Sequence, residues 1–148
     1  MAKQYQVNSM VRLANRMMIR LNQWGIAAPN SYVLTVRGRK TGKTYSVPVL
    51  LVEDNRQRWL VAPYGEVSWV RNARVAGEVT LSRKGQAEIL KIREVNPQES
   101  APILKQYITR EKIVRPYFDV VPDASLEAFA AEAPRHPVFQ LLTRTAES

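Results

Sequence analysis

The chain has 148 residues, of which 45% are hydrophobic and 24% are charged, as in ordinary soluble globular proteins. The absence of cysteine excludes disulfides, thiolate catalysis and cysteine-based metal centres, and a single histidine excludes a histidine-rich metal site, so we expect no metal. The net charge of +9 predicts an acidic partner, which could be nucleic acid, an anionic membrane or an anionic small molecule. We expect one domain over residues 1–148, without a signal peptide or membrane span, in the cytoplasm.

The first predicted element is an amphipathic helix over residues 7–24. Its apolar residues recur at helical spacing, and Arg12, Arg16 and Arg20 form one basic stripe. The stripe is consistent with a solvated face, with a wall over a cofactor tail, or with peripheral binding to the inner face of an anionic membrane.

Two apolar, β-branched segments follow, and we predict strands over Ser31–Arg37 and Tyr45–Glu53. The turn between them carries two glycines and a group of cations: Gly38, Gly42, Arg37, Arg39, Lys40 and Lys43. Such a turn is either a solvated hairpin or an anion cradle, in which backbone N–H groups and cations meet an anion. It is not a Walker A loop, because its glycines are too close and a strand follows it. Pro48 should lie at a sheet edge or a bulge.

The rest of the chain alternates hairpins and helices. We predict a third strand at Gln57–Ala62, a helix at Glu66–Ala76 ending at Gly77, and a hairpin of Glu78–Arg83 with Gln86–Val95. A helix capped by Asn96, an irregular segment at Val114–Pro122, a helix at Ser125–Ala133 and a strand at Pro137–Thr143 complete the chain. This order predicts an α+β fold whose roughly six antiparallel strands close a small barrel.

Four blocks of this sequence resemble the deazaflavin-dependent nitroreductase family. They are Leu34–Gly42, Val47-Pro48, Val61–Gly65 and Ser68–Asn72, within a resemblance that runs from about Ser31 to Glu94. The resemblance implies a split β-barrel that uses the deazaflavin coenzyme F420, with FMN as the alternative cofactor. It also implies a reductase that transfers a hydride to a small electron-poor substrate of the nitro, quinone or enone type.

The resemblance also implies which residues hold the cofactor. The phosphate would meet Arg39, Lys40 and Thr41, and the second strand would line the cofactor with Tyr45, Ser46, Val47, Pro48, Val49 and Leu50. The polar edge of the ring would face Ala62, Pro63, Tyr64 and Gly65, followed by Ser68, Trp69, Val70, Arg71 and Asn72. Relatives often carry arginine in place of Tyr45, and Lys43 or Arg37 could replace that contact.

By the same resemblance, Tyr117 lies where relatives carry tyrosines near the open face of the ring. It could supply the proton that must follow hydride transfer, or it could be a packed residue of a proline-bounded loop. His136, between two prolines, is interpreted as part of a fixed turn.

The alternative function is a split-barrel binding protein for flavin, haem or an acyl ligand, at a membrane in one version. A nucleic-acid partner is not expected, because the cations are dispersed and no RNA-binding motif is present. The oligomeric state is either monomer or homodimer.

Overall fold

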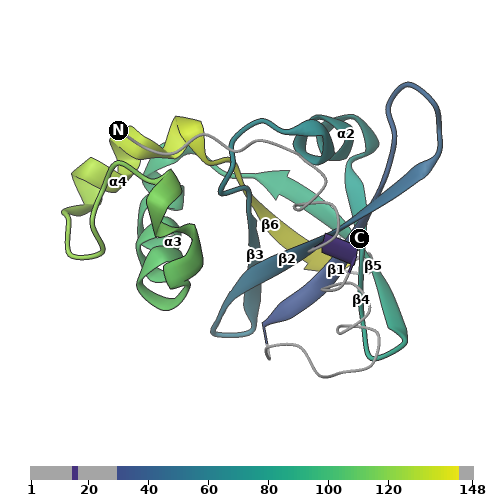
Figure 1. Ribbon diagram of the computed structural model, residues 1–148, viewed down its shortest axis with the longest axis horizontal. Coiled ribbons are helices and arrows are strands. Elements are labelled where there is room, and N and C mark those ends of the chain that lie inside the picture. The colour runs from purple at the N-terminus through teal and green to yellow at the C-terminus, as the bar shows by residue number, and fades with distance from the viewer. Residues whose placement is uncertain (1–14, 17–29, 144–148) are drawn as a thin grey trace.

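The structure is a computed structural model that describes residues 15–16 and 30–143 (Figure 1). The predicted helix over residues 7–24 lies outside the described residues apart from 15–16, and so do Arg12 and Arg20. Arg16 is exposed.

Six strands form a closed barrel in which every pair of neighbours is antiparallel. The strands are β1 (Ser31–Arg37), β2 (Thr44–Asp54), β3 (Gln57–Val61), β4 (Glu78–Arg83), β5 (Gln86–Glu94) and β6 (Val138–Thr143). Their order around the barrel is β1-β2-β3-β6-β5-β4. The predicted α+β barrel is confirmed, and the predicted strands match the observed ones to within a residue at each end.

Strand β2 changes its partner halfway along its length. Its first part, residues 44–50, pairs with β1, whereas residues 51–54 pair with β3. Pro48 lies opposite Val33 in the first part, which has a described strand neighbour on one side only. The expected edge position of Pro48 is therefore confirmed, since a residue without an N–H group is tolerated there.

Two apolar clusters hold the fold together, and β2 contributes to both because successive side chains on a strand face opposite sides. Leu51 belongs to the barrel interior with Leu34, Leu60 and Leu90, while its neighbour Val52 faces a second cluster. That second cluster lies beneath α3 (Pro97–Arg110), η1 (Lys112–Tyr117), α4 (Leu126–Glu132) and η2 (Ala133–Arg135). In Figure 1 this helical layer stands at the left of the barrel, and α2 (Ser68–Ala76) lies near the top of the view.

Several predicted helix boundaries are confirmed. Gly77 ends α2 with φ of 75° and donates its N–H to the carbonyl of Ala73 over 2.8 Å. Asn96 caps α3 by accepting the N–H of Glu99 at 2.8 Å. Helix α2 begins at Ser68, two residues later than predicted.

The prediction of an irregular segment at Val114–Pro122 is wrong in its first part. Residues Lys112–Tyr117 form a 3-10 helix. Arg115 stabilises this helix because its guanidinium donates to the carbonyls of Ile108 at 2.7 Å and Thr109 at 3.0 Å, in the last turn of α3. Among the described residues, no helix has the length and apolar content that crossing a membrane requires.

Candidate functional site

The basic turn between β1 and β2 is held by its own backbone. Gly38 donates its N–H to the carbonyl of Lys43 at 2.6 Å, and Gly42 donates to the carbonyl of Gly38 at 3.1 Å. Gly42 has φ of 74°, which glycine adopts without strain. The Thr41 hydroxyl accepts the N–H of Lys43 at 3.2 Å. The turn therefore has a defined shape rather than that of a loose loop.

Tyr45 packs over Gly38 at the base of this turn. A Cβ atom at position 38 would lie 2.6 Å from Cε2 of Tyr45 and 3.1 Å from the carbonyl oxygen of Lys43. The Tyr45 hydroxyl lies 3.2 Å from Oγ1 of Thr41, and the ring is 48% exposed. Glycine is needed here because the tyrosine ring approaches the backbone so closely.

The turn is fastened to α2 through Arg39 and Asn72. The side-chain oxygen of Asn72 accepts the backbone N–H of Arg39 at 3.1 Å and the guanidinium Nη1 of the same residue at 2.6 Å. Asn72 is only 5% exposed, whereas Arg39 is exposed. A buried amide thus fixes the direction of an arginine whose other N–H groups can reach a ligand.

The cations of the turn have no carboxylate partner among the described residues, in contrast to four arginines elsewhere in the fold. Arg58, Arg74, Arg93 and Arg135 each lie beside a carboxylate. Across residues 15–16 and 30–143, no ion pair with a carboxylate is found for Arg37, Arg39, Lys40 or Lys43, which share this one exposed turn. Such a group of cations attracts an anion through its charge. The N–H groups of Gly38 and Gly42 are donated within the turn, so the expected contribution of these glycine N–H groups to an anion cradle is not found.

The predicted cofactor-lining residues of β2 divide between the two faces of the strand. Val47 and Val49 pack in the barrel interior and Leu50 packs against the second cluster. Ser46 and Pro48 lie on the alternate positions, and the Ser46 hydroxyl lies 2.8 Å from that of Thr35. Val49 is 9% exposed and belongs to the barrel core, so its side chain is not a lining surface for a ligand.

The segment from Ala62 to Gly65 links β3 to α2. Ala62 is fully buried in the barrel and donates its N–H to the carbonyl of Pro137 at 2.8 Å. Gly65 has φ of 89° and its N–H approaches the carbonyl of Ala62 at 3.3 Å. Tyr64 projects from this bend and is 37% exposed.

Helix α2 presents the last group of predicted residues. Val70 is fully buried in the barrel core and Trp69 is half-buried against Phe139, with ring centroids 6.1 Å apart. Ser68 and Arg71 are exposed. Of these residues, Val70 offers no side-chain surface to a ligand, and Trp69 packs on the core while leaving part of its ring accessible.

Tyr117 lies beside Tyr64, although 53 positions separate them in the chain (117 minus 64). Their rings meet edge to face, with centroids 4.7 Å apart and an interplanar angle of 72°. Aromatic pairs favour this arrangement. The sequence placed both residues in the candidate site, but nothing in it predicted that they touch.

Sequence reasoning missed the role of His136. Its ring is 3% exposed, donates from Nδ1 to the carbonyl of Pro63 at 2.9 Å, and places Nε2 2.7 Å from Oε2 of Glu132. The interpretation of His136 as part of a fixed turn omitted these contacts. The spacing of four residues between Glu132 and His136 was the one available signal.

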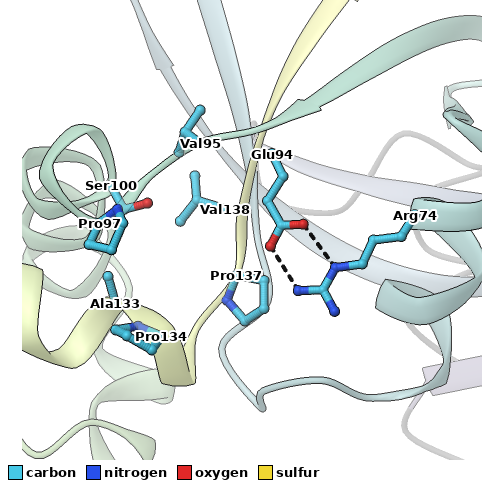
Figure 2. A pocket seen from close by; sticks show the side chains of 9 residues that line it. All are labelled: Arg74, Glu94, Val95, Pro97, Ser100, Ala133, Pro134, Pro137 and Val138. Atoms are coloured by element: carbon cyan, nitrogen blue, oxygen red, sulfur yellow. Dashed lines mark hydrogen bonds and ion pairs between the residues drawn. The ribbon is translucent and has the colours of Figure 1, made fainter.

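A pocket of about 170 Å³ is lined by residues that do not include any of the predicted site residues (Figure 2). Its lining is mainly apolar and includes Val95, Pro97, Pro137 and Val138. Its one cation, Arg74, is bound to Glu94 at 2.7 Å and also pairs with Glu66. No group of three or more His, Cys, Asp or Glu side chains that could hold a metal occurs in the described part of the chain.

The closed barrel and its flanking helices form a small split β-barrel fold. The chain belongs to the F420H(2)-dependent quinone reductase family, whose profile matches residues 9–119. It is therefore an oxidoreductase with coenzyme F420 as its cofactor, as the resemblance implied. No curated protein matches the chain.

Solved structures of low sequence identity share the fold. An F420-H2 dependent reductase, FDR-A, is 22% identical over 76% of this chain and 94% of its own, with a TM-score of 0.53. A protein of unknown function from Agrobacterium tumefaciens is 14% identical over 96% of this chain and 59% of its own, with a TM-score of 0.59. A third, described as a domain-swapped dimer, is 18% identical over 90% of this chain and 99% of its own, with a TM-score of 0.55.

Proposed function

We propose that this reductase binds the phosphate of F420 at the turn between β1 and β2 and reduces a quinone or a similarly electron-poor small molecule. The observation that carries the proposal is the group of cations without a described carboxylate partner in a turn that Asn72 holds in place. F420 carries a phosphodiester and a glutamate tail, so its charge complements this turn.

The remaining predicted residues would surround the rest of the cofactor. Ser46 and Pro48 lie on the β2 face that the barrel core does not use, and Trp69 exposes part of its ring. The backbone from Ala62 to Gly65 would meet the polar edge of the ring system. When bound in reduced form, F420 supplies the hydride, and the chain's own residues bind, orient and shield the reactants.

Reduction of a quinone also requires a proton. Tyr117 is half-buried next to Tyr64, and its phenol is our candidate for a proton donor on the substrate side. Water is the competing donor, because the chain has no cysteine and its one histidine is buried and hydrogen-bonded at both nitrogens.

The substrate class is tested by mixing the protein with reduced F420 and one acceptor at a time, without oxygen. Menadione, nitrofurantoin and cyclohexenone represent the quinone, nitro and enone classes, and the return of oxidised F420 absorbance measures turnover. We expect menadione to react fastest, because the family is described by quinone reduction. Reaction with the enone or nitro compound alone would contradict the quinone assignment, and no reaction with any of them would contradict the proposed function.

We also propose that the protein binds a membrane surface and forms a dimer. The predicted basic stripe of residues 12, 16 and 20 would let the protein bind an anionic membrane surface at the inner face, where lipid-soluble quinones reside. The related structure described as a domain-swapped dimer favours a homodimer over a monomer, which light scattering of the purified protein would decide.

A further inference from the structure

His136 lies where four segments of the chain meet. Its Nδ1 donates to the carbonyl of Pro63 on the β3–α2 connection, and its Nε2 lies 2.7 Å from Oε2 of Glu132 on α4. Its ring stacks on Phe118, with centroids 3.7 Å apart and an interplanar angle of 12°. The residue itself stands between η2 and β6.

Glu132 adds a second connection to the same neighbourhood. It is 6% exposed, and its Oε2 accepts the backbone N–H of Asp119 at 3.1 Å and lies 3.4 Å from Nη2 of Arg135. A buried carboxylate requires such partners, since an unpaired one carries a large desolvation cost. The carboxylate thus ties α4 to the residue that follows Phe118.

The contacts of His136 fall on the direct neighbours of the tyrosine pair. Pro63 precedes Tyr64, and Phe118 follows Tyr117. The two tyrosine rings touch edge to face at 4.7 Å, and this contact joins the β3–α2 connection to the end of η1. One buried imidazole therefore contacts both segments from which the pair projects, through the backbone carbonyl of Pro63 and through the side-chain ring of Phe118.

We propose that His136, supported by Glu132, is a positioning residue that sets the separation of Tyr64 and Tyr117 and so shapes the substrate side of the site. The inference rests on the proposed function for its kinetic consequence, because only then does the tyrosine pair border the substrate. The effect of His136 on the separation of the two tyrosines does not depend on the proposed function. The imidazole acts through the two segments it holds and touches neither reactant.

Two substitutions at position 136 separate the contacts of the ring. His136→Phe keeps a flat ring to stack on Phe118 but removes the donor to Pro63 and the contact with Glu132. His136→Asn is the conservative variant, because an Asn amide can occupy the place of Nδ1 and donate to the Pro63 carbonyl. Glu132→Gln provides a third variant if His136→Phe does not fold.

The first measurement needs neither cofactor nor activity. Fluorotyrosine can be incorporated at the six tyrosines, and the ¹⁹F signals can be assigned with single Tyr→Phe variants. We expect His136→Phe, or Glu132→Gln in its place, to shift the signals of Tyr64 and Tyr117 while the signal of Tyr45 on the basic turn stays unchanged. Unchanged signals of Tyr64 and Tyr117 would overturn the inference.

The second measurement is the kinetics with reduced F420 and menadione. We expect His136→Phe to raise KM for menadione about tenfold, as small displacements of positioning groups do, with F420 affinity unchanged and largely normal KM in His136→Asn. Leu90→Ala is the control for a general loss of stability, since Leu90 is fully buried in the barrel interior, in a cluster that includes neither tyrosine nor His136. An equal rise of KM in Leu90→Ala, or no rise in His136→Phe, would overturn the positioning role.

The two proposals fail in different ways. If the wild-type protein neither binds F420 nor oxidises its reduced form, the proposed function is wrong. The ¹⁹F signals then still decide whether His136 sets the tyrosine pair.

Discussion

Asn72 offers a direct test of whether one buried amide orients Arg39 in the basic turn for cofactor binding. Its oxygen accepts from both the backbone and the guanidinium of Arg39, so Asn72→Ala removes two contacts at once. We expect F420 affinity to fall about tenfold, because hydrogen bonds to charged groups each contribute roughly 1.5–3 kcal/mol. The readout is a fluorescence titration with F420.

A double-mutant cycle shows whether Asn72 acts through Arg39. If it does, Asn72→Ala weakens binding less in an Arg39→Ala background than in the wild type. Full additivity of the two losses would mean that Asn72 affects the cofactor independently of this arginine.

Tyr117→Phe removes a hydroxyl while leaving the ring that packs on Tyr64. If the phenol donates the proton, turnover with menadione should fall about 10²–10⁴-fold with F420 affinity nearly unchanged. Tyr32→Phe is the control, because Tyr32 lies on β1 beside Arg83, outside the predicted site residues. Wild-type turnover in Tyr117→Phe would assign proton delivery to water.

The buried imidazole of His136 predicts how stability depends on pH. Burial lowers its pKa below the ordinary 6.5, and the hydrogen bonds to Glu132 and Pro63 offset only part of that shift, while nearby Arg135 adds to it. The unfolded chain therefore binds more protons below pH 6.5, and the free energy of unfolding should decrease as pH falls through that range.

Urea unfolding at several pH values measures this effect. Because the chain has one histidine, His136→Gln should flatten the dependence near pH 6, and the imidazole NMR signal reports the pKa without ambiguity. A pKa above 6.5 in the folded protein would contradict the prediction.

At the scale of elements, the β1–β2 hairpin is the part that the sequence predicted best. Its two strands are adjacent in the chain and pair with each other, and its turn glycines are required by the close approach of Tyr45 and by the backbone conformation. The second partner of β1 is β4, which no local pattern predicted. The contact of its tip with α2 was not predictable, because 33 positions separate Arg39 from Asn72 (72 minus 39) and no local pattern connects them.

The predicted helix over residues 7–24 leads to a prediction about membrane binding. If the stripe of Arg12, Arg16 and Arg20 binds anionic lipid, the protein should sediment with phosphatidylglycerol vesicles but not with phosphatidylcholine ones. Each cation near such a surface contributes about 1 kcal/mol, and salt screens it.

Replacing the three arginines with glutamine gives the matched comparison. The variant should stay in solution under conditions in which the wild type sediments at low salt. Equal behaviour of the two proteins would leave the stripe as a solvated face or a cofactor wall.

At the scale of the whole molecule, hairpin order and strand count predicted the barrel, because four of its six antiparallel pairs join strands that follow one another in sequence. The two pairings that close it, β1 with β4 and β3 with β6, join strands distant in the chain and had no local signal. The individual helices of the helical layer were largely predicted, but the contacts that join them to one another and to the barrel were not. The contacts of His136 with Pro63 and Phe118 span distant segments, and a histidine between prolines carries no local signal for them. Contacts between side chains of distant segments cannot be predicted from the local sequence.

The central claim is that the basic turn, rather than the general positive charge, binds the cofactor. The most direct test compares F420 affinity in Arg39→Ala/Lys40→Ala with that in Arg110→Ala/Lys112→Ala. This control also removes two exposed cations, but from the end of α3 and the start of η1. We predict at least a roughly tenfold loss of affinity for the turn variant and wild-type affinity for the control, since charge-assisted contacts contribute roughly 1.5–3 kcal/mol each. Equal affinities in the two variants would contradict the account.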